Sequence, residues 1–227
     1  MASLDGKVFN EAKCIARKGG RFAFAVSLGR DCAVMLDLMN RLTDIKRHKF
    51  FHWSHYPELL PYHAKYLNLI KKRYGIEIDV HLWPEDYKGK QATFVSDYME
   101  RNGCDLAIFG YRMDESLQRR GMLNKLENGI DEVRKWAYPL RSFTKKTIRG
   151  YVNTFRVPLQ IEYNIGIGRD MTEHRNENAY MLRHFISETD YQSAIRQKPE
   201  IEVDYVRYAN DPEFLRRLYG GKKDKEK

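Results

Sequence analysis

The sequence predicts an α/β fold: a Rossmann-like parallel sheet with helices on both faces, followed by a mostly helical C-terminal appendage. Short apolar segments alternate with amphipathic helical segments, an order that is typical of parallel strands joined by right-handed crossovers. The segment 105–109 (DLAIF) is almost entirely apolar, as expected of a strand covered on both faces. The segment 22–32 (FAFAVSLGRDC) reads as a strand, a tight turn and the start of a helix.

The individual elements follow from hydrophobic periodicity and from capping residues. Apolar residues spaced three or four apart predict helices at 8–18, 30–45, 59–74, 90–101 and 144–155. Short β-prone runs predict strands at 22–27, 49–53, 77–82, 105–109 and 137–140. Gly75 and Gly103 close helices and Thr144 caps one. The segment 110–129 is predicted to be a polar loop.

The chain of 227 residues is long enough for one large domain with a small appendage. We expect a nucleotide-binding α/β domain at 1–159, where the strand and helix pattern is regular. The pattern weakens after Pro158, so residues 160–220 are assigned to the appendage. The last residues, 221–227, form a short basic tail that we expect to be disordered.

Composition limits the class of protein and its partners. The 40 Lys and Arg exceed the 31 Asp and Glu, which gives a net charge of +9 and favours polyanions, either phosphate-bearing ligands or nucleic acid. No apolar run is long enough for a membrane span, and the N-terminus lacks a signal peptide core, so we expect no membrane partner and a cytoplasmic location. The three cysteines fit no zinc or disulfide spacing, so no resident metal site is predicted. A homo-oligomer is compatible with the sequence.

The first candidate site is the turn after the first strand. A helix that starts directly after a strand presents unpaired amide N–H groups and its positive dipole end, and both attract phosphate. A glycine in the turn is expected to supply unusual dihedral angles and a close approach to a ligand. A hydroxyl can donate to phosphate, an arginine can neutralise it, and a carboxylate can order the loop or hold Mg²⁺. The residues concerned are Ser27, Leu28, Gly29, Arg30, Asp31 and Cys32.

The second candidate site follows the strand 105–109. Three guanidinium groups lie within nine residues at the expected carboxyl edge of the sheet, and forked donors of this kind match phosphate or sulfate oxygens. Two carboxylates between them, Asp114 and Glu115, can tether the arginines. Ligands of open α/β sheets bind beyond the carboxyl ends of the strands, so the two candidate sites are expected to meet. The residues of this second element are Gly110, Arg112, Glu115, Arg119 and Arg120.

With these residues in view, the chain resembles the adenine nucleotide alpha-hydrolase-like (PP-loop) superfamily, and within it the phosphoadenosine phosphosulfate (PAPS) reductase family. The segment 27–32 is similar to the family's Ser-Gly-Gly-x-Asp-Ser loop, and 50–60 (FFHWSHYPELL) to its strand followed by Pro-Glu-Thr. The Gly-x-Arg-x-x-Glu-Ser-x-x-Arg element appears at 110–119, and the Pro-Leu-x-x-Trp-Thr element at 139–151. The motifs occur in the family's order over residues 20 to 163.

The resemblance implies an adenine nucleotide as ligand, either ATP or a 3′-phosphorylated, sulfated adenosine, with Mg²⁺ as its companion. In such a site Ser27, Gly29 and Arg30 cradle pyrophosphate, and the backbone at His52 and Trp53 borders the adenine. The predicted catalytic residues are Arg30, Asp31 and Arg112. Related enzymes cleave ATP between the α and β phosphates and adenylate an acceptor, with the protein supplying position and charge.

Departures from the family pattern define the alternatives. Leu28 stands in place of a glycine, Cys32 in place of a hydroxyl residue, and no cysteine follows Cys104. Reduction of a sulfonate needs a nucleophilic thiolate. Cys32 and Cys104 are the two possible substitutes. A thiol at a helix N-terminus, as at Cys32, is expected to have a lowered pKa, but its position in the phosphate loop does not match the family's chemistry. The reading favoured is an ATP pyrophosphatase or adenylating enzyme with an unidentified acceptor. The alternative is a non-catalytic nucleotide-binding or nucleic-acid-associated regulator, and an active sulfonucleotide reductase ranks third.

Overall fold

A computed structural model of the chain describes residues 6–54, 60–82 and 91–159, and the single residues 188, 192, 196, 206 and 210. The predictions for the basic tail, for most of the appendage and for the turns after the second and third strands fall outside these residues. The chain divides into two compact units, residues 1–55 with 66–160 and residues 56–65 with 161–227. In the second unit, the Asn210 amide N–H donates to the Val206 carbonyl at 3.1 Å, as in a helical turn.

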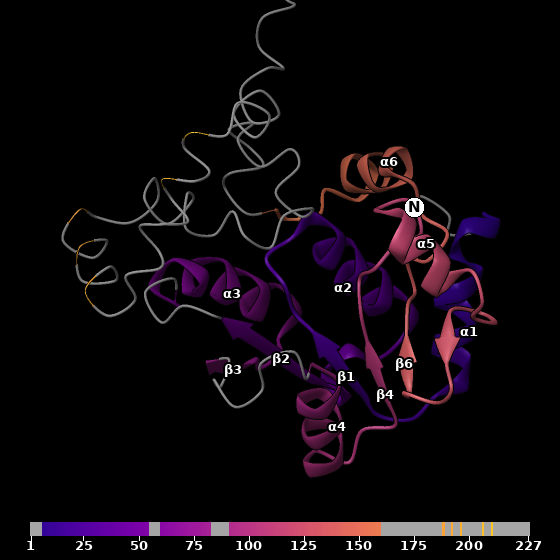
Figure 1. Cartoon of the computed structure of the whole chain (residues 1–227), viewed down its shortest axis with the longest axis horizontal. Coiled ribbons are helices and arrows are strands. Elements are labelled where there is room, and N and C mark those ends of the chain that lie inside the picture. The colour runs from indigo at the N-terminus through magenta and orange to yellow at the C-terminus, as the bar shows by residue number, and fades with distance from the viewer. Residues whose placement is uncertain are drawn as a thin grey trace, which may run out of the picture. The chain divides into compact units, whose positions relative to one another are not determined.

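A six-stranded sheet with the order β3-β2-β1-β4-β6-β5 forms the centre of the first unit (Figure 1). The neighbouring strands are parallel except β5 and β6, which pair antiparallel as a short hairpin. Ala23 of β1 lies opposite Lys49 of β2 and Ala107 of β4, so β1 is central. The strands are β1 (Phe22–Ala25), β2 (Lys49–Ser54), β3 (Asp79–Leu82), β4 (Leu106–Ile108), β5 (Ile130–Asp131) and β6 (Trp136–Ala137).

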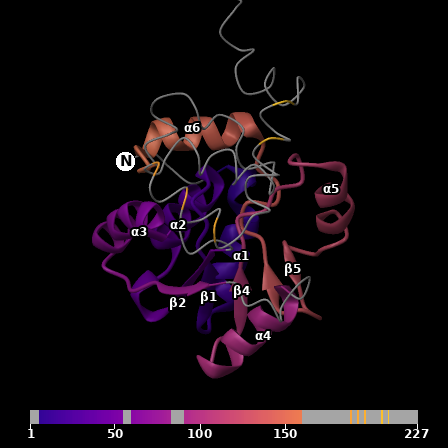
Figure 2. The ribbon, with the colours of Figure 1, turned by 60° about the vertical axis from the view of Figure 1, so that its left-hand side comes forward.

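Helices cover both faces of the sheet (Figures 1 and 2). Phe22 and Phe24 point into a core with side chains of α1, α2, α3 and α6, while Ala23 faces a second core with α4 and α5. This alternation is the period of two of a β-strand. Among the described helices, none is both long and apolar enough to cross a membrane. The helices are η1 (Lys7–Phe9), α1 (Asn10–Lys18), α2 (Arg30–Leu42), η2 (Ile45–Arg47), α3 (Leu60–Tyr74), α4 (Gln91–Arg101), α5 (Leu117–Leu123) and α6 (Lys145–Phe155).

The predicted fold class is confirmed, and two local predictions are wrong. The segment 110–129 is not entirely loop, since α5 lies within it. The Ser116 hydroxyl accepts the Arg119 amide at 3.1 Å, and Leu123 is fully buried, so a cap and one apolar anchor sustain this short helix. The sheet is not wholly parallel, because β5 returns to β6 as a hairpin. The predicted cap of α6 is confirmed, with the Thr144 hydroxyl accepting the Thr147 amide at 3.1 Å.

The strand order brings two particular strand ends together. β1 has β2 on one side and β4 on the other, so the chain leaves β1 and β4 at neighbouring points of the same edge. In open α/β sheets, such a reversal of strand order is where ligands bind. Here α2 starts after β1, and the segment that leads to α5 starts after β4.

A buried carboxylate, Asp37, ties α2 to α3 and α6 beside this edge. Its side chain is 3% exposed and accepts the Arg41 Nε at 2.7 Å. The hydroxyls of Tyr151 and Tyr74 donate to its two oxygens at 3.0 and 3.4 Å. Burial and the neighbouring carboxylate raise the pKa of both tyrosines, which keeps them protonated as donors. The network fixes α2, whose first turn lies in the candidate site.

We predict that Asp37→Ala lowers the free energy of unfolding by about 2 kcal/mol, because it leaves two buried tyrosine hydroxyls without an acceptor and removes the partner of the partly exposed Arg41. Urea denaturation measures this change. The control is Glu132→Ala, which removes the exposed ion pair with Lys18 and is expected to cost less than about 1 kcal/mol. Equal effects of the two substitutions would contradict the role given to Asp37.

Candidate functional site

The turn between β1 and α2 presents open amide groups. Gly29 is the N-cap of α2, and the first helical hydrogen bond runs from the Ala33 amide to the Gly29 carbonyl at 3.1 Å. No described residue accepts a hydrogen bond from the amides of Asp31 or Cys32. Unpaired first-turn amides and the positive helix end form an anion site. The geometry thus fits the predicted phosphate-binding role.

The conformational reason predicted for Gly29 is wrong. Its φ of −71° and ψ of 154° are ordinary extended values, which any residue can adopt. The turn is held instead by side chains around it. The Gly29 amide donates to the Ser27 hydroxyl at 3.4 Å, and Leu28 packs against the core on the α2 face of the sheet.

Cys32 is a structural thiol in this turn. It is 3% exposed. Its sulfur accepts the Ser27 amide at 3.2 Å and its thiol donates to the Ala25 carbonyl at 3.6 Å. Burial raises the pKa of the thiol to about 12, so the lowered pKa expected from the helix N-terminus is wrong. Desolvation by burial is the largest cause and outweighs the hydrogen bond from Ser27, so Cys32 is unsuited to act as a nucleophilic thiolate.

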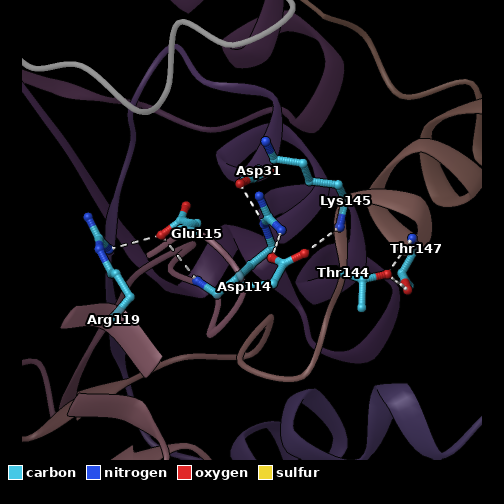
Figure 3. A network of polar contacts seen from close by, with 8 residues as sticks. Asp31, Asp114, Glu115, Arg119, Thr144, Lys145 and Thr147 are labelled. Atoms are coloured by element: carbon cyan, nitrogen blue, oxygen red, sulfur yellow. Dashed lines mark hydrogen bonds and ion pairs between the residues drawn. The ribbon is translucent and has the colours of Figure 1, made fainter. Parts of the chain in front are cut away.

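A buried ion pair joins the two candidate sites. Arg112, 1% exposed, donates from Nε to the Asp31 Oδ2 at 2.7 Å. Its Nη1 also contacts the carboxylate of Asp114, whose other oxygen accepts the Lys145 amide at 2.8 Å. Arg112 therefore connects the first turn of α2, the segment after β4 and the N-terminus of α6. Figure 3 shows Asp31, Asp114 and Lys145 converging from these elements.

The backbone at Gly110 lies directly on the turn between β1 and α2. A Cβ on Gly110 would lie 3.3 Å from the Asp31 carbonyl carbon and 3.3 Å from the Cys32 amide nitrogen. Both neighbours are backbone atoms at the start of α2, so they can yield little. A glycine at 110 is therefore favoured by this close approach rather than by its dihedral angles.

The other residues of the second element take distinct places. The Glu115 Oε2 accepts the Arg112 amide at 3.4 Å and pairs with the Arg119 Nη1 at 3.4 Å. Burial raises the pKa of Glu115 to about 7 against the opposing effect of Arg119. Arg120 is exposed and makes no ion pair with a described residue. The expectation that carboxylates tether the arginines is met by Asp114 on Arg112 and by Glu115 on Arg119.

One carboxylate oxygen remains open at the junction. The Asp31 Oδ1 is buried and has no hydrogen-bond partner among the described residues, although a buried carboxylate is normally satisfied. Figure 3 shows the Lys145 side chain running toward Asp31. An oxygen placed in this way can accept a hydrogen bond from a ligand or bind a cation.

The residues expected to border adenine lie at the end of β2. His52 is buried, and its Nδ1 lies 2.8 Å from the Val26 carbonyl oxygen, which fixes the strand against the phosphate turn. Trp53 points to the other face, stacked on Phe51 with ring centroids 5.3 Å apart. Their contact with a nucleotide remains a prediction.

Two residues at the site were not among the predicted ones. Lys145 was placed only within a helix, and its position at the site depends on the hydrogen bond of its amide to Asp114, 31 positions away. Tyr111 lies under Arg119, whose Cζ is 3.3 Å from the ring centroid. The sequence of 110–120 gave no signal for the contact between Tyr111 and Arg119, because the helix α5 that carries Arg119 was not predicted.

Comparison with known proteins shows similarity at the level of the fold. No family model matches the chain, and no curated protein matches its sequence. The structure is similar to FMN adenylyltransferase of Candida glabrata, solved with FMN and the ATP analogue AMPCPP. The TM-score is 0.53 at 16% identity, over 74% of this chain and 64% of that one. The same enzyme with FAD and inorganic pyrophosphate gives a TM-score of 0.51 at 15% identity, over 72% and 64%.

A phosphoadenylyl-sulfate (PAPS) reductase of Candida auris, in a phosphate complex, gives a TM-score of 0.46 at 10% identity, over 72% of this chain and 87% of that one. The chain spans 64% of the length of the FMN adenylyltransferase. At 16% identity, the similarity to the FMN adenylyltransferase shows a shared fold, the Rossmann-like α/β architecture predicted from the sequence.

The raised pKa of Glu115 predicts a pH dependence of stability. Because the folded pKa of about 7 exceeds the ordinary 4.5, the folded state binds more protons in this window, and stability falls as pH rises through it. Relative to Glu115→Gln, the wild type is expected to lose up to about 1.4 kcal/mol of unfolding free energy per pH unit. Urea denaturation at pH 5 and pH 7 measures it, and identical slopes for both proteins would refute it.

The burial of Cys32 predicts its reactivity. In the native protein at pH 8, we expect a thiol reagent to label the half-buried Cys14 while Cys32 stays unlabelled until the protein is denatured. Peptide mapping by mass spectrometry after timed labelling distinguishes the two thiols. Labelling of native Cys32 faster than Cys14 would show that its thiol is accessible and activated.

Proposed function

We propose that the protein is an ATP-dependent adenylating enzyme that releases pyrophosphate. The observation that supports this most is the buried pair of Arg112 and Asp31 at 2.7 Å, which fixes the arginine element against open amides at the start of α2. A phosphate anchor and a cationic element are thereby held on one sheet edge. Chemistry at the α-phosphate needs such fixed positive groups more than it needs a nucleophilic side chain.

The proposed reaction uses the site as follows. An acceptor oxygen attacks the α-phosphorus of ATP, the bond from this phosphorus to the bridging oxygen breaks, and pyrophosphate leaves on the turn 27–32. The amides of Asp31 and Cys32 hold the leaving group, and Arg30 in the first turn adds positive charge. Arg112 acts by position, since its guanidinium is engaged with Asp31 and Asp114.

Mg²⁺ fits this site as a companion of the nucleotide. It binds proteins through one or two carboxylates together with substrate phosphates, and the open Asp31 Oδ1 offers one such oxygen. The described residues contain no group of three His, Cys, Asp or Glu side chains able to hold a metal alone. The ion, when bound, would neutralise charge on the phosphates.

ATP is preferred over a sulfated adenosine as the nucleotide. Sulfonate reduction needs a thiolate, and the Cys32 thiol is buried with its pKa raised to about 12. Cys104 also has a raised pKa through burial. The acceptor is an open question for which FMN is the first compound to try, since a protein of the same fold is an FMN adenylyltransferase.

The test combines binding and turnover. We expect ATP to bind in the presence of magnesium, as measured by calorimetry, and Asp31→Asn to weaken that binding at least tenfold. Glu132→Gln, on an exposed hairpin residue, is the matched control and should bind normally. Pyrophosphate release is then measured with labelled ATP against a panel of acceptors that includes FMN. Absence of both ATP binding and pyrophosphate release would reject the proposal.

A second candidate function is a nucleic-acid-associated regulator without turnover. It is favoured by the two helices at the site, since the sequences of α5 and α6 contain no Asp or Glu. Exposed cations on such surfaces bind phosphate backbones. Their cationic residues are Arg119, Arg120, Lys145, Lys146 and Arg149.

Nucleic-acid binding gives this candidate its own test. We expect a regulator to bind DNA or RNA with an affinity that falls steeply with salt and to lose it in the double variant Lys146→Gln, Arg149→Gln. Binding would survive Asp31→Asn, and no pyrophosphate would be released. Gel-shift titrations at two salt concentrations measure these effects, and turnover with a small acceptor would favour the enzyme instead.

A further inference from the structure

Three planar groups are stacked beside the phosphate turn. The rings of Tyr138 and Tyr111 are stacked, with centroids 5.8 Å apart and an interplanar angle of 23°. The Arg119 Cζ lies 3.3 Å from the Tyr111 centroid. At that separation a guanidinium can only lie flat on a ring, because an edge-on approach would overlap the atoms. The Tyr111 ring therefore stacks with the Tyr138 ring and with the Arg119 guanidinium.

The stack is held in place from several sides. Tyr138 is fully buried, and the Gln91 amide group donates to the Tyr111 hydroxyl at 3.3 Å. Glu115 pairs with the edge of the Arg119 guanidinium at 3.4 Å. The orientation of the guanidinium plane is therefore fixed before any ligand arrives, which lowers the entropic cost of stacking on it.

The Arg119 side chain is partly exposed to solvent. Its exposed fraction is 25%, although its Nη1 atom is itself buried, and the ring of Tyr111 lies on one face of its guanidinium. A guanidinium face has no hydrogen-bond donor pointing out of its plane and is weakly hydrated, so it favours flat, electron-rich rings. Nucleobases are commonly bound on arginine planes in this way.

The sheet topology separates Arg119 from the residues proposed to border adenine. β1 lies between β2 and β4 in the sheet. The residues proposed to border adenine are on β2, whereas Arg119 belongs to α5, which follows β4. Figure 3 shows Arg119 on the far side of Glu115 from Asp31. A ring on Arg119 is thus separated from the adenine by the phosphate turn.

We propose that the acceptor contains a planar heteroaromatic ring, a nucleobase or a comparable fused ring, and that this ring stacks on the outer face of Arg119. The proposal rests on the proposed function, because it assigns a ring to the acceptor of the adenylation. It makes Arg119 a specificity-determining residue that reads ring shape, while its charge serves mainly to hold Glu115.

The test compares ligands with and without a ring. The protein is first saturated with AMPCPP and magnesium, and binding of FMN, GMP, CMP and ribose 5-phosphate is then measured by calorimetry. We expect at least one ring-bearing probe to bind about tenfold more tightly than ribose 5-phosphate, the gain typical of one stacked base. Arg119→Lys, which keeps the charge and loses the plane, should remove this gain, as should Tyr111→Leu.

Controls separate the possible failures. Tyr111→Phe keeps the ring and Arg17→Lys alters an exposed arginine of α1, so both should retain the gain, and thermal unfolding confirms that each variant is folded. The proposal is overturned if no ring probe binds better than ribose 5-phosphate, or if Arg119→Lys keeps the gain. If Arg119→Lys weakens the binding of AMPCPP as much as it weakens the binding of the ring probe, the ring on Arg119 is the adenine. That result would also overturn the proposal. Failure of AMPCPP to bind the wild type would instead reject the proposed function.

Discussion

The ion pair between Arg112 and Asp31 is the contact on which the candidate site depends. It lies between the first turn of α2 and the segment after β4, two parts of the chain that are 81 positions apart. Both side chains are almost fully buried, and the loss of Arg112 would leave the Asp31 carboxylate without this partner in a low-dielectric environment. The pair therefore fixes the position of each element relative to the other, and Asp114 extends it to α6.

The charges around this pair explain the character of the site. Asp31, Asp114 and Glu115 are set against Arg112 and Arg119, so the carboxylates outnumber the guanidinium groups. Burial raises the pKa of Glu115 to about 7, which favours its protonated form near neutral pH. The Asp31 Oδ1 has no hydrogen-bond partner among the described residues and can therefore pair with a cation. An anionic ligand on the adjacent amides would draw on both effects.

Sequence reasoning predicted the strands and most of the helices, because periodicity is a local signal, and it predicted that the segments after β1 and β4 meet, because strand order follows from the α/β pattern. It missed α5, since a seven-residue helix depends on one cap and one buried leucine rather than on periodicity. It gave Gly29 and Cys32 the wrong physical roles, because a φ angle and the burial of a thiol depend on neighbours distant in sequence. The ion pair of Arg112 with Asp31 and the stacking of Arg119 on Tyr111 depend on the folded arrangement in the same way, so the sequence did not predict them.

A double-mutant cycle on Asp31 and Arg112 tests the central claim most directly. Unfolding free energy and ATP affinity are measured for Asp31→Asn, Arg112→Met and the double variant. If the pair joins the two elements into one site, the double variant is little worse than either single one, with a coupling of about 1 kcal/mol or more in both quantities. Additive effects in both quantities would show that the two elements act independently and would contradict the account.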